Sequence, residues 1–310
     1  MEYIKHGTPF SSYCKRGKVK QCFLHNPKQV VNATNIISLY LDHTIDDDDL
    51  ELLKFIWKAE FSVQEQINRY ALAHNIQHVA ERLDKMFSNF IIHKFFLYAA
   101  TSEKGPAPGD AEIIFCLGEG GKYLIENYID EYIIWNLENL SVSGSLVSKH
   151  LIDTEMWLNV MFGTNNLEVM EYRKRPKFYI DKDTLILNSN YLFNIEGRNY
   201  YMVTDVIGST QDVLRLRPRI RMIGMLFESN IWRKYYPDTA KAPMILFIVD
   251  TDEDADRLAK EISSTTRLQA ENYRFTTSER MKEGIGTDKS FILYDKDSGE
   301  LYETGINIFK

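Results

Sequence analysis

Residues 62–86 read SVQEQINRYALAHNIQHVAERLDKM and predict two short helices joined by a tight turn. Ser62 and Glu65 have the spacing of a capping box, which marks the start of the first helix. Apolar residues recur at helical spacing from Ile76 to Leu83 and give the second helix a buried face. Two helices joined in this way form a helix-turn-helix, so this stretch decides the fold of the first half of the chain.

The flanking segments extend this motif to a winged helix-turn-helix. The acidic run at 46–49 precedes LELLKFIWKAEF (50–61), and acids at a helix N-terminus complement the helix dipole. NFIIHKFFLYA (89–99) and AEIIFCLG (111–118) are rich in β-branched and aromatic residues and enclose a turn-forming stretch. We therefore expect one more helix before the motif and a β-hairpin, the wing, after it.

The chain is long enough for two domains, and its composition suggests where they meet. Residues 1–44 are a locally basic N-terminal arm, either a solvated or packed leader or a segment that lies along phosphates. The winged helix-turn-helix spans residues 45–137, and the Ser-rich stretch 138–150 is the expected linker. Residues 151–310 form the second domain.

The second domain has the pattern of an α/β fold. Strand patterns come first, within residues 177–208, and strands and helices then alternate toward the C-terminus. A helix is expected at 217–236, where Pro218 suits the first turn. PMILFIVD (243–250) is a continuous apolar strand of the buried kind. We expect an α+β protein whose second domain packs helices on a mixed sheet.

Charge and composition limit the classes of function. The net charge of −7 excludes a general polycation, so any nucleic-acid contact needs a local basic patch. The chain has neither a signal peptide nor a membrane-spanning stretch, so we expect a cytoplasmic protein without membrane contact. Cys14, Cys22 and Cys116 are too few for a disulfide framework, and Cys14, Cys22 and His25 would supply only three zinc ligands. We expect no metal and no cofactor.

Five weaker motifs follow the helix-turn-helix region in a fixed order. They are IIFCLGEGGKYLIE (113–126), SKHLIDTEMWLNVMF (148–162), YYMVTDVIGST (200–210), PMILFIVDTDEDADRLAKEI (243–262) and YRFTTSERM (273–281). Together with the winged helix, this order resembles the replication-relaxation family, proteins encoded on plasmids and integrative elements of Gram-positive bacteria. The resemblance implies a DNA-binding accessory role in plasmid replication or conjugative mobilisation. It also implies a second domain similar to a restriction-endonuclease core and, as partner, a relaxase or replication initiator.

The expected contacts with double-stranded DNA lie on the helix that begins at Ile76 and at the base of the wing. Their side chains are of the types that hydrogen-bond base edges or phosphates. The six residues are Gln77, His78, Arg82, Lys85, His93 and Lys94. Glu81 and Asp84, on or near the same face, oppose phosphate. Because this hypothesis places the cations in solvent, replacing Arg82 and Lys85 by alanine should weaken DNA binding and leave thermal stability nearly unchanged.

The second domain has few of the residues that a metal-dependent nuclease needs. Such a site places one acid on a strand, then an acid and a lysine two residues apart on the next strand. Asp181 or Asp183 and then Asp205 are the candidates, but Ile207 stands where the lysine is needed. We expect no catalytic residue and no enzymatic activity. Asp205 either helps to hold a divalent ion loosely or is satisfied by nearby backbone N–H groups.

Two hypotheses from different classes follow. The first is an accessory factor that binds double-stranded DNA. The second is an adaptor whose winged helix contacts protein and whose degenerate nuclease-like domain is an interaction scaffold. A metal-dependent nuclease is the remaining alternative. The sequence leaves open whether the protein forms a homodimer.

Overall fold

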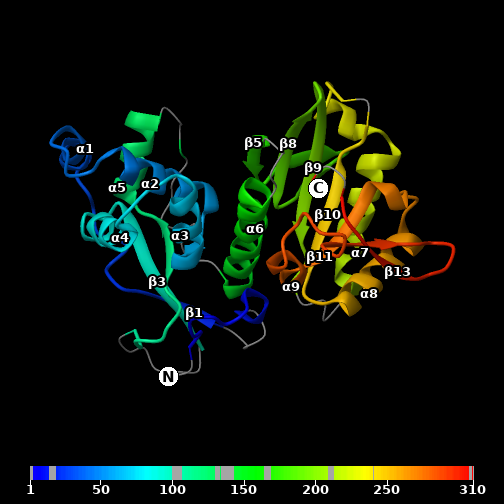
Figure 1. The fold of residues 1–310 in the computed structure, drawn as a ribbon, viewed down its shortest axis with the longest axis horizontal. Helices are drawn as coiled ribbons and strands as arrows, with labels where there is room; N and C mark the ends of the chain where they lie inside the picture. Colours follow the sequence, from blue (N-terminus) through cyan, green and yellow to red (C-terminus); the bar gives the residue numbers. More distant parts are fainter. Residues whose placement is uncertain are drawn as a thin grey trace. The chain divides into compact units, whose positions relative to one another are not determined.

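The computed structural model divides the chain into two compact units, residues 1–154 and residues 155–310 (Figure 1). It describes residues 3–13, 19–99, 107–129, 133, 143–163, 169–208, 213–239, 241–306 and 309. Both units combine helices with strands, and the larger sheet is mixed, so the expected α+β class is confirmed. Within these ranges, none of the helices has the length and apolar character that a membrane crossing requires.

Unit 1 contains a small antiparallel sheet. β3 (Ile92–Ala99) and β4 (Ile114–Leu117) pair as the expected hairpin, and the short strand β2 (Ser62–Val63) pairs with β4. β1 (Val19–Phe23) pairs with β3, which gives the order β1-β3-β4-β2. Phe95 of β3 is fully buried in the core of this unit.

Side-chain and backbone caps set the helix boundaries of unit 1. The Asp46 side chain caps α2 and forms a capping box with Asp49. The box expected from Ser62 and Glu65 does not form, because Ser62 lies in β2 and the Gln66 side chain accepts the Val63 N–H instead. The helices are η1 (Phe10–Tyr13), α1 (Ala33–Leu41), α2 (Asp47–Ala59), α3 (Gln64–Ala73), α4 (Val79–Ser88), α5 (Glu119–Leu124) and η2 (Ile125–Ile129).

The expected arm and linker are parts of the folded units. Within residues 1–44, Ile4 and Tyr13 are buried and β1 belongs to the sheet, so this arm packs against unit 1. Of the expected linker, residues 138–142 lie outside the described residues, whereas residues 144–150 form the start of α6 (Gly144–Phe162). Val147 and Leu151 of α6, one helical turn apart, pack in the core of unit 1 and stabilise the helix there.

Unit 2 is built on a mixed sheet with the strand order β13-β12-β11-β10-β9-β8-β5. β9, β10 and β11 are parallel neighbours, and the other pairs are antiparallel. β6 and β7 form a separate hairpin. The strands are β5 (Val169–Lys174), β6 (Lys177–Ile180), β7 (Asp183–Ile186), β8 (Ser189–Ile195), β9 (Arg198–Val206), β10 (Met244–Val249), β11 (Tyr273–Thr277), β12 (Phe291–Tyr294) and β13 (Leu301–Thr304).

Both faces of this sheet are covered, which explains the continuous apolar run in β10. Ile245 and Phe247 join the core formed with the helices α7 and α8, while Leu246 and Ile248 are equally buried on the other face. The β6–β7 hairpin packs into the same core as α7. The remaining helices are α7 (Val213–Glu228), η4 (Ile231–Lys234), α8 (Asp252–Thr265), η5 (Ala270–Asn272) and α9 (Ser278–Lys282).

Pro218 lies inside α7 and not in its first turn. α7 begins at Val213, five residues before Pro218. Leu216 packs against the same core as Ile220, one turn further on, so apolar burial extends the helix toward its N-terminus. The hydrogen bond that Pro218 cannot donate is a local cost that this packing offsets.

Glycines at the start of α5 allow it to approach the turn that precedes β3. The Gly118 N–H donates to the Ile91 carbonyl at 2.9 Å. A Cβ on Gly118 would lie 2.5 Å from the Phe90 carbonyl oxygen, and one on Gly121 would lie 2.4 Å from the Ile91 carbonyl oxygen. The Gly-rich stretch at 118–121 therefore serves close packing.

We expect Gly121→Ala to destabilise unit 1 by about 2 kcal/mol, because the added methyl group overpacks a backbone contact. Gly109→Ala is the matched control, since a Cβ at Gly109 would meet no atom within 4 Å. Urea denaturation followed by circular dichroism measures both variants. Equal free energies of unfolding for the two variants would contradict the packing role of Gly121.

Candidate functional site

Arg82, an expected DNA contact, is held by the acidic start of α2. Its Nη1 lies 2.6 Å from Asp46 Oδ1 and 2.9 Å from Asp49 Oδ1, and its Nη2 lies 2.9 Å from Asp48 Oδ2. Its Nε donates to the Gln77 carbonyl at 2.9 Å. Each guanidinium nitrogen thus has a partner, and only 16% of the side chain is exposed.

Lys85 completes this cluster, which we call the α2–α4 clamp: Asp46, Asp48, Asp49, Arg82 and Lys85. The Lys85 ammonium donates to Asp49, whose carboxylate is fully buried. Burial alone would lower the pKa of Arg82, but its hydrogen bonds to Asp46 and Asp49 raise it. Arg82 and Lys85 therefore fasten α4 to α2, and the expectation that their loss leaves stability unchanged is corrected.

His93, an expected phosphate contact, lies in the interior of unit 1 and is only 2% exposed. Its Nδ1 lies 2.6 Å from His25 Nε2, and the Phe23 ring packs edge-on against it. Burial lowers the pKa of His93 to about 4, with His25 adding to the effect, so the ring is neutral near pH 7. A buried, neutral imidazole cannot contact phosphate, and this expectation is corrected.

Lys94, the other expected contact at the wing, is paired within the fold. Its ammonium forms an ion pair with Asp84 of α4 and lies 4.9 Å from the ring centroid of Phe87 and 5.5 Å from that of Phe115. Only 12% of the Lys94 side chain is exposed. A phosphate contact would require Lys94 to leave both the carboxylate and the rings.

Gln77 and His78 are the expected DNA contacts that the structure places in solvent. His78 has a left-handed backbone conformation just before α4, and its Nδ1 lies 3.7 Å from Glu81. Glu81 and Asp84 are also exposed, and no cation of α4 faces solvent freely. The exposed face of α4 is therefore acidic.

Asp205 of unit 2 is paired with a cation. It is fully buried on β9, and Arg219 of α7 binds both of its oxygens, at 2.7 Å through Nε and 2.6 Å through Nη2. The same Nη2 donates to the Ile186 carbonyl at 2.6 Å. Burial would lower the pKa of Arg219, but the charge of Asp205 raises it. Arg219 satisfies Asp205, in place of the backbone N–H groups that the sequence offers as one alternative.

The two alternative acids for a nuclease site, Asp181 and Asp183, are exposed elsewhere in unit 2. Asp183 is exposed at the start of β7, in the hairpin separate from the main sheet. Asn188 accepts the Val206 N–H at 2.9 Å, and Asn190 accepts the Tyr236 hydroxyl at 2.9 Å. Among the described residues, no group of three or more His, Cys, Asp or Glu side chains is placed to hold a metal ion.

The described cysteines are buried thiols. Cys22 and Cys116 are both free and buried, and burial raises the pKa of Cys116. His25, which with Cys14 and Cys22 would supply three zinc ligands, contacts His93. Cys14 lies outside the described residues.

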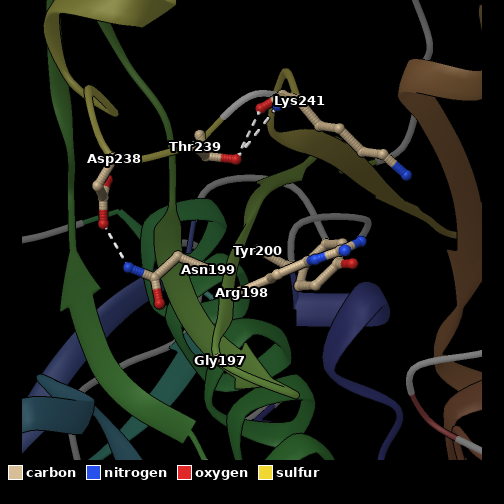
Figure 2. Close-up of a pocket in the computed structure, with 7 residues that line it drawn as sticks. All are labelled: Gly197, Arg198, Asn199, Tyr200, Asp238, Thr239 and Lys241. Carbon is tan, nitrogen blue, oxygen red and sulfur yellow. Dashed lines mark hydrogen bonds between the residues drawn. The ribbon is translucent and has the colours of Figure 1, made fainter.

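A hollow of about 380 Å³ in unit 2 gathers polar side chains that the sequence does not bring together (Figure 2). The turn between β8 and β9 forms one side, and the segment before β10 forms the other. We call it the β9 hollow, and its lining residues are Gly197, Arg198, Asn199, Tyr200, Asp238, Thr239 and Lys241. The sequence does not predict that residues 238–241 approach the β8–β9 turn, which lies about forty positions earlier.

Hydrogen bonds hold the one carboxylate of the β9 hollow. Asp238 accepts hydrogen bonds from Asn199 and from the Tyr201 hydroxyl, the latter at 2.9 Å. The bond from Asn199, followed by that from Tyr201, lowers the pKa of Asp238. Burial, together with the bond to Asp238, raises the pKa of Tyr201 to about 12. Asp238 thus stays ionised and turned toward these two donors.

Comparison of the chain with protein-family models, with curated proteins and with solved structures gives no match. The resemblance to the replication-relaxation family therefore stays an expectation from the sequence. The geometry of the two units is what bears on function.

We expect Arg82→Ala to destabilise unit 1 by about 3 kcal/mol, because it removes a cation from the buried carboxylate of Asp49. Glu81→Ala is the control on the same helix and should change stability by less than about 0.5 kcal/mol, since Glu81 is exposed. Thermal and urea denaturation measure both variants. If Arg82→Ala unfolds with the wild-type free energy, the clamp does not stabilise the fold.

We expect stability to fall by about 2 kcal/mol between about pH 7 and about pH 5 because of His93. Its folded pKa lies below the ordinary value of 6.5, so the unfolded chain takes up the proton first as the pH falls. Urea denaturation across this range should show a weaker pH dependence in His93→Asn. His78→Asn, at an exposed position, should keep the wild-type dependence, and an unchanged profile in His93→Asn would contradict the assignment.

Proposed function

We propose that the protein is a protein-interaction adaptor, with a winged helix in unit 1 and a non-catalytic, nuclease-like scaffold in unit 2. The observation that carries the proposal is the α2–α4 clamp. It engages Arg82 and Lys85, the two cations that a DNA-reading α4 would present to solvent.

The element order of unit 1 supports a winged helix. α2, α3 and α4 are followed by the β3–β4 hairpin, and β2 joins β4 at the edge of the sheet. Three helices and a wing in this order are typical of winged helix-turn-helix modules. The fold does not determine which partner such a module binds, so the partner must be inferred from the surface residues.

The charge of that surface favours a basic partner. The exposed face of α4 carries Glu81, and Asp47 is exposed at the start of α2. On α3, Leu72 is 80% exposed and adds an apolar contact. Carboxylates repel the DNA backbone but attract a basic protein segment. The family resemblance suggests a relaxase or replication initiator as that partner.

The pairing of Asp205 with Arg219 supports a scaffold without nuclease activity. In a metal-dependent nuclease, a carboxylate that binds the metal ion needs an oxygen atom that is free to coordinate it. Both oxygens of Asp205 are hydrogen-bonded to the guanidinium of Arg219. Buried Ile207 offers no amine to activate water.

Binding to double-stranded DNA is the second candidate function. Gln77 and His78 favour it, because both are exposed at the N-terminal end of α4. In helix-turn-helix proteins this end enters the major groove, and both side chains can hydrogen-bond bases. The acidic residues that follow weigh against it.

A salt titration of DNA binding separates the two functions. The adaptor should bind duplex DNA weakly, without sequence preference, between about 50 and about 200 mM salt. In a pull-down, the wild type and the control Glu279→Lys in unit 2 should retain the basic partner, the relaxase or replication initiator. Glu81→Lys should no longer retain it. Sequence-specific duplex binding that Gln77→Ala/His78→Ala abolishes would support the DNA candidate and contradict the adaptor.

We expect supercoiled plasmid to remain uncut by the protein with Mg²⁺ or Mn²⁺. We also expect Asp205→Asn to lower the free energy of unfolding by about 3 kcal/mol, because Arg219 loses its buried counter-charge. Agarose gels and urea denaturation measure the two effects. Nicking by the wild type that Asp205→Asn abolishes, while the variant stays folded, would make the protein a nuclease.

A further inference from the structure

The β9 hollow holds two cations that no carboxylate of the described residues neutralises. Arg198 and Lys241 form no ion pair there, whereas Arg82, Lys85 and Arg219 are each paired. Asp238, the acid that lines the hollow, is bound to Asn199 and Tyr201. In a chain with a net charge of −7, these two cations give the hollow a local positive charge.

An aromatic ring lies beside these cations. Arg198 and Tyr200 are two residues apart on β9 and so leave the strand on the same side. Figure 2 shows Asn199 pointing to Asp238, while Arg198 and Tyr200 extend the opposite way, toward the side that Lys241 also approaches. The Lys241 ammonium lies 6.0 Å from the centre of the Tyr200 ring.

We propose that the β9 hollow binds a nucleotide, with its phosphate on Arg198 and Lys241 and its base against Tyr200. A guanidinium and an ammonium are the groups that hold phosphate oxygens, and the guanidinium does so with paired N–H donors. A tyrosine ring accepts any base by stacking. The volume of about 380 Å³ is at the lower end for small-molecule sites and accommodates a ligand of this size.

Two ligands present a phosphate and an accessible base in this way: a free nucleotide and a nucleotide within a single strand. Paired bases in a duplex are stacked inside the helix and cannot reach Tyr200 without flipping out. The hollow is therefore expected to prefer unpaired nucleotides. This site lies in unit 2 and does not depend on the adaptor surface of unit 1.

The test measures binding of the full chain to four probes. They are adenosine 5′-monophosphate by calorimetry and, by fluorescence polarisation, a labelled oligodeoxyadenylate, the same strand in a duplex, and a polyglutamate peptide. The single strand should bind more tightly than the duplex and the peptide. Adenosine monophosphate bound as tightly as the strand identifies a free nucleotide as the ligand, and binding of the strand alone identifies single-stranded nucleic acid.

Variants assign the binding to the β9 hollow. Arg198→Gln/Lys241→Gln should weaken binding of the preferred probe about tenfold or more. For the single strand it should also reduce the slope of log affinity against log salt by about 0.7, as loss of one neutralised phosphate requires. Tyr200→Leu should weaken binding about fivefold or more with little change of slope.

Matched controls in the same unit are Lys182→Gln and Tyr179→Leu, both at exposed positions outside the hollow. Both should bind like the wild type. The proposal is overturned if neither nucleotide probe binds, if the duplex or the peptide binds as tightly as the nucleotide probes, or if the hollow variants bind like the controls. Circular dichroism confirms that each variant is folded.

Discussion

The packing of unit 1 depends on the contact between the buried carboxylate of Asp49 and the two cations of α4. A carboxylate removed from water is costly unless opposite charges and hydrogen-bond donors surround it. Asp49 has Arg82, Lys85 and the backbone N–H of Asp46 around it. This constraint fixes where α4 lies against α2 and removes its cations from the surface.

Unit 2 repeats this arrangement with Asp205 and Arg219. There a strand-end acid, which sequence reasoning considers as a metal ligand, meets an arginine from a helix fourteen residues later. In both units an acid and a base that look functional in the sequence neutralise each other in the fold. Exposed charges outside such pairs, among them Glu81 on unit 1 and Arg198 and Lys241 on unit 2, remain for a partner.

The sequence predicts the elements well and the pairing of charges poorly. The pattern of apolar residues locates α2, α3 and α4, the β3–β4 hairpin and the apolar strand β10. Burial of one face requires apolar residues at the period of the element, and burial of both faces requires a continuous apolar run. This pattern does not locate the partner of Arg82, which lies 33 to 36 positions away, or the burial of His93. The acidic run at 46–49 is the one signal, since it carries more charge than a helix dipole needs. Spacing alone does not say which cations meet it.

A cation is available to a ligand only when the fold has not already given it a carboxylate. Arg82 forms ion pairs with three carboxylates. Arg198 lies next to the β8–β9 turn and forms no ion pair with a described acid. Both are single arginines in mixed-charge sequence, so their local patterns are alike. Their difference comes from topology, because α2 brings its acidic end to α4, whereas the segment before β10 brings Lys241 to β9. For this reason Arg198 and Lys241 form no ion pair among the described residues, whereas Arg82 and Lys85 of the helix that the sequence marks for DNA are paired.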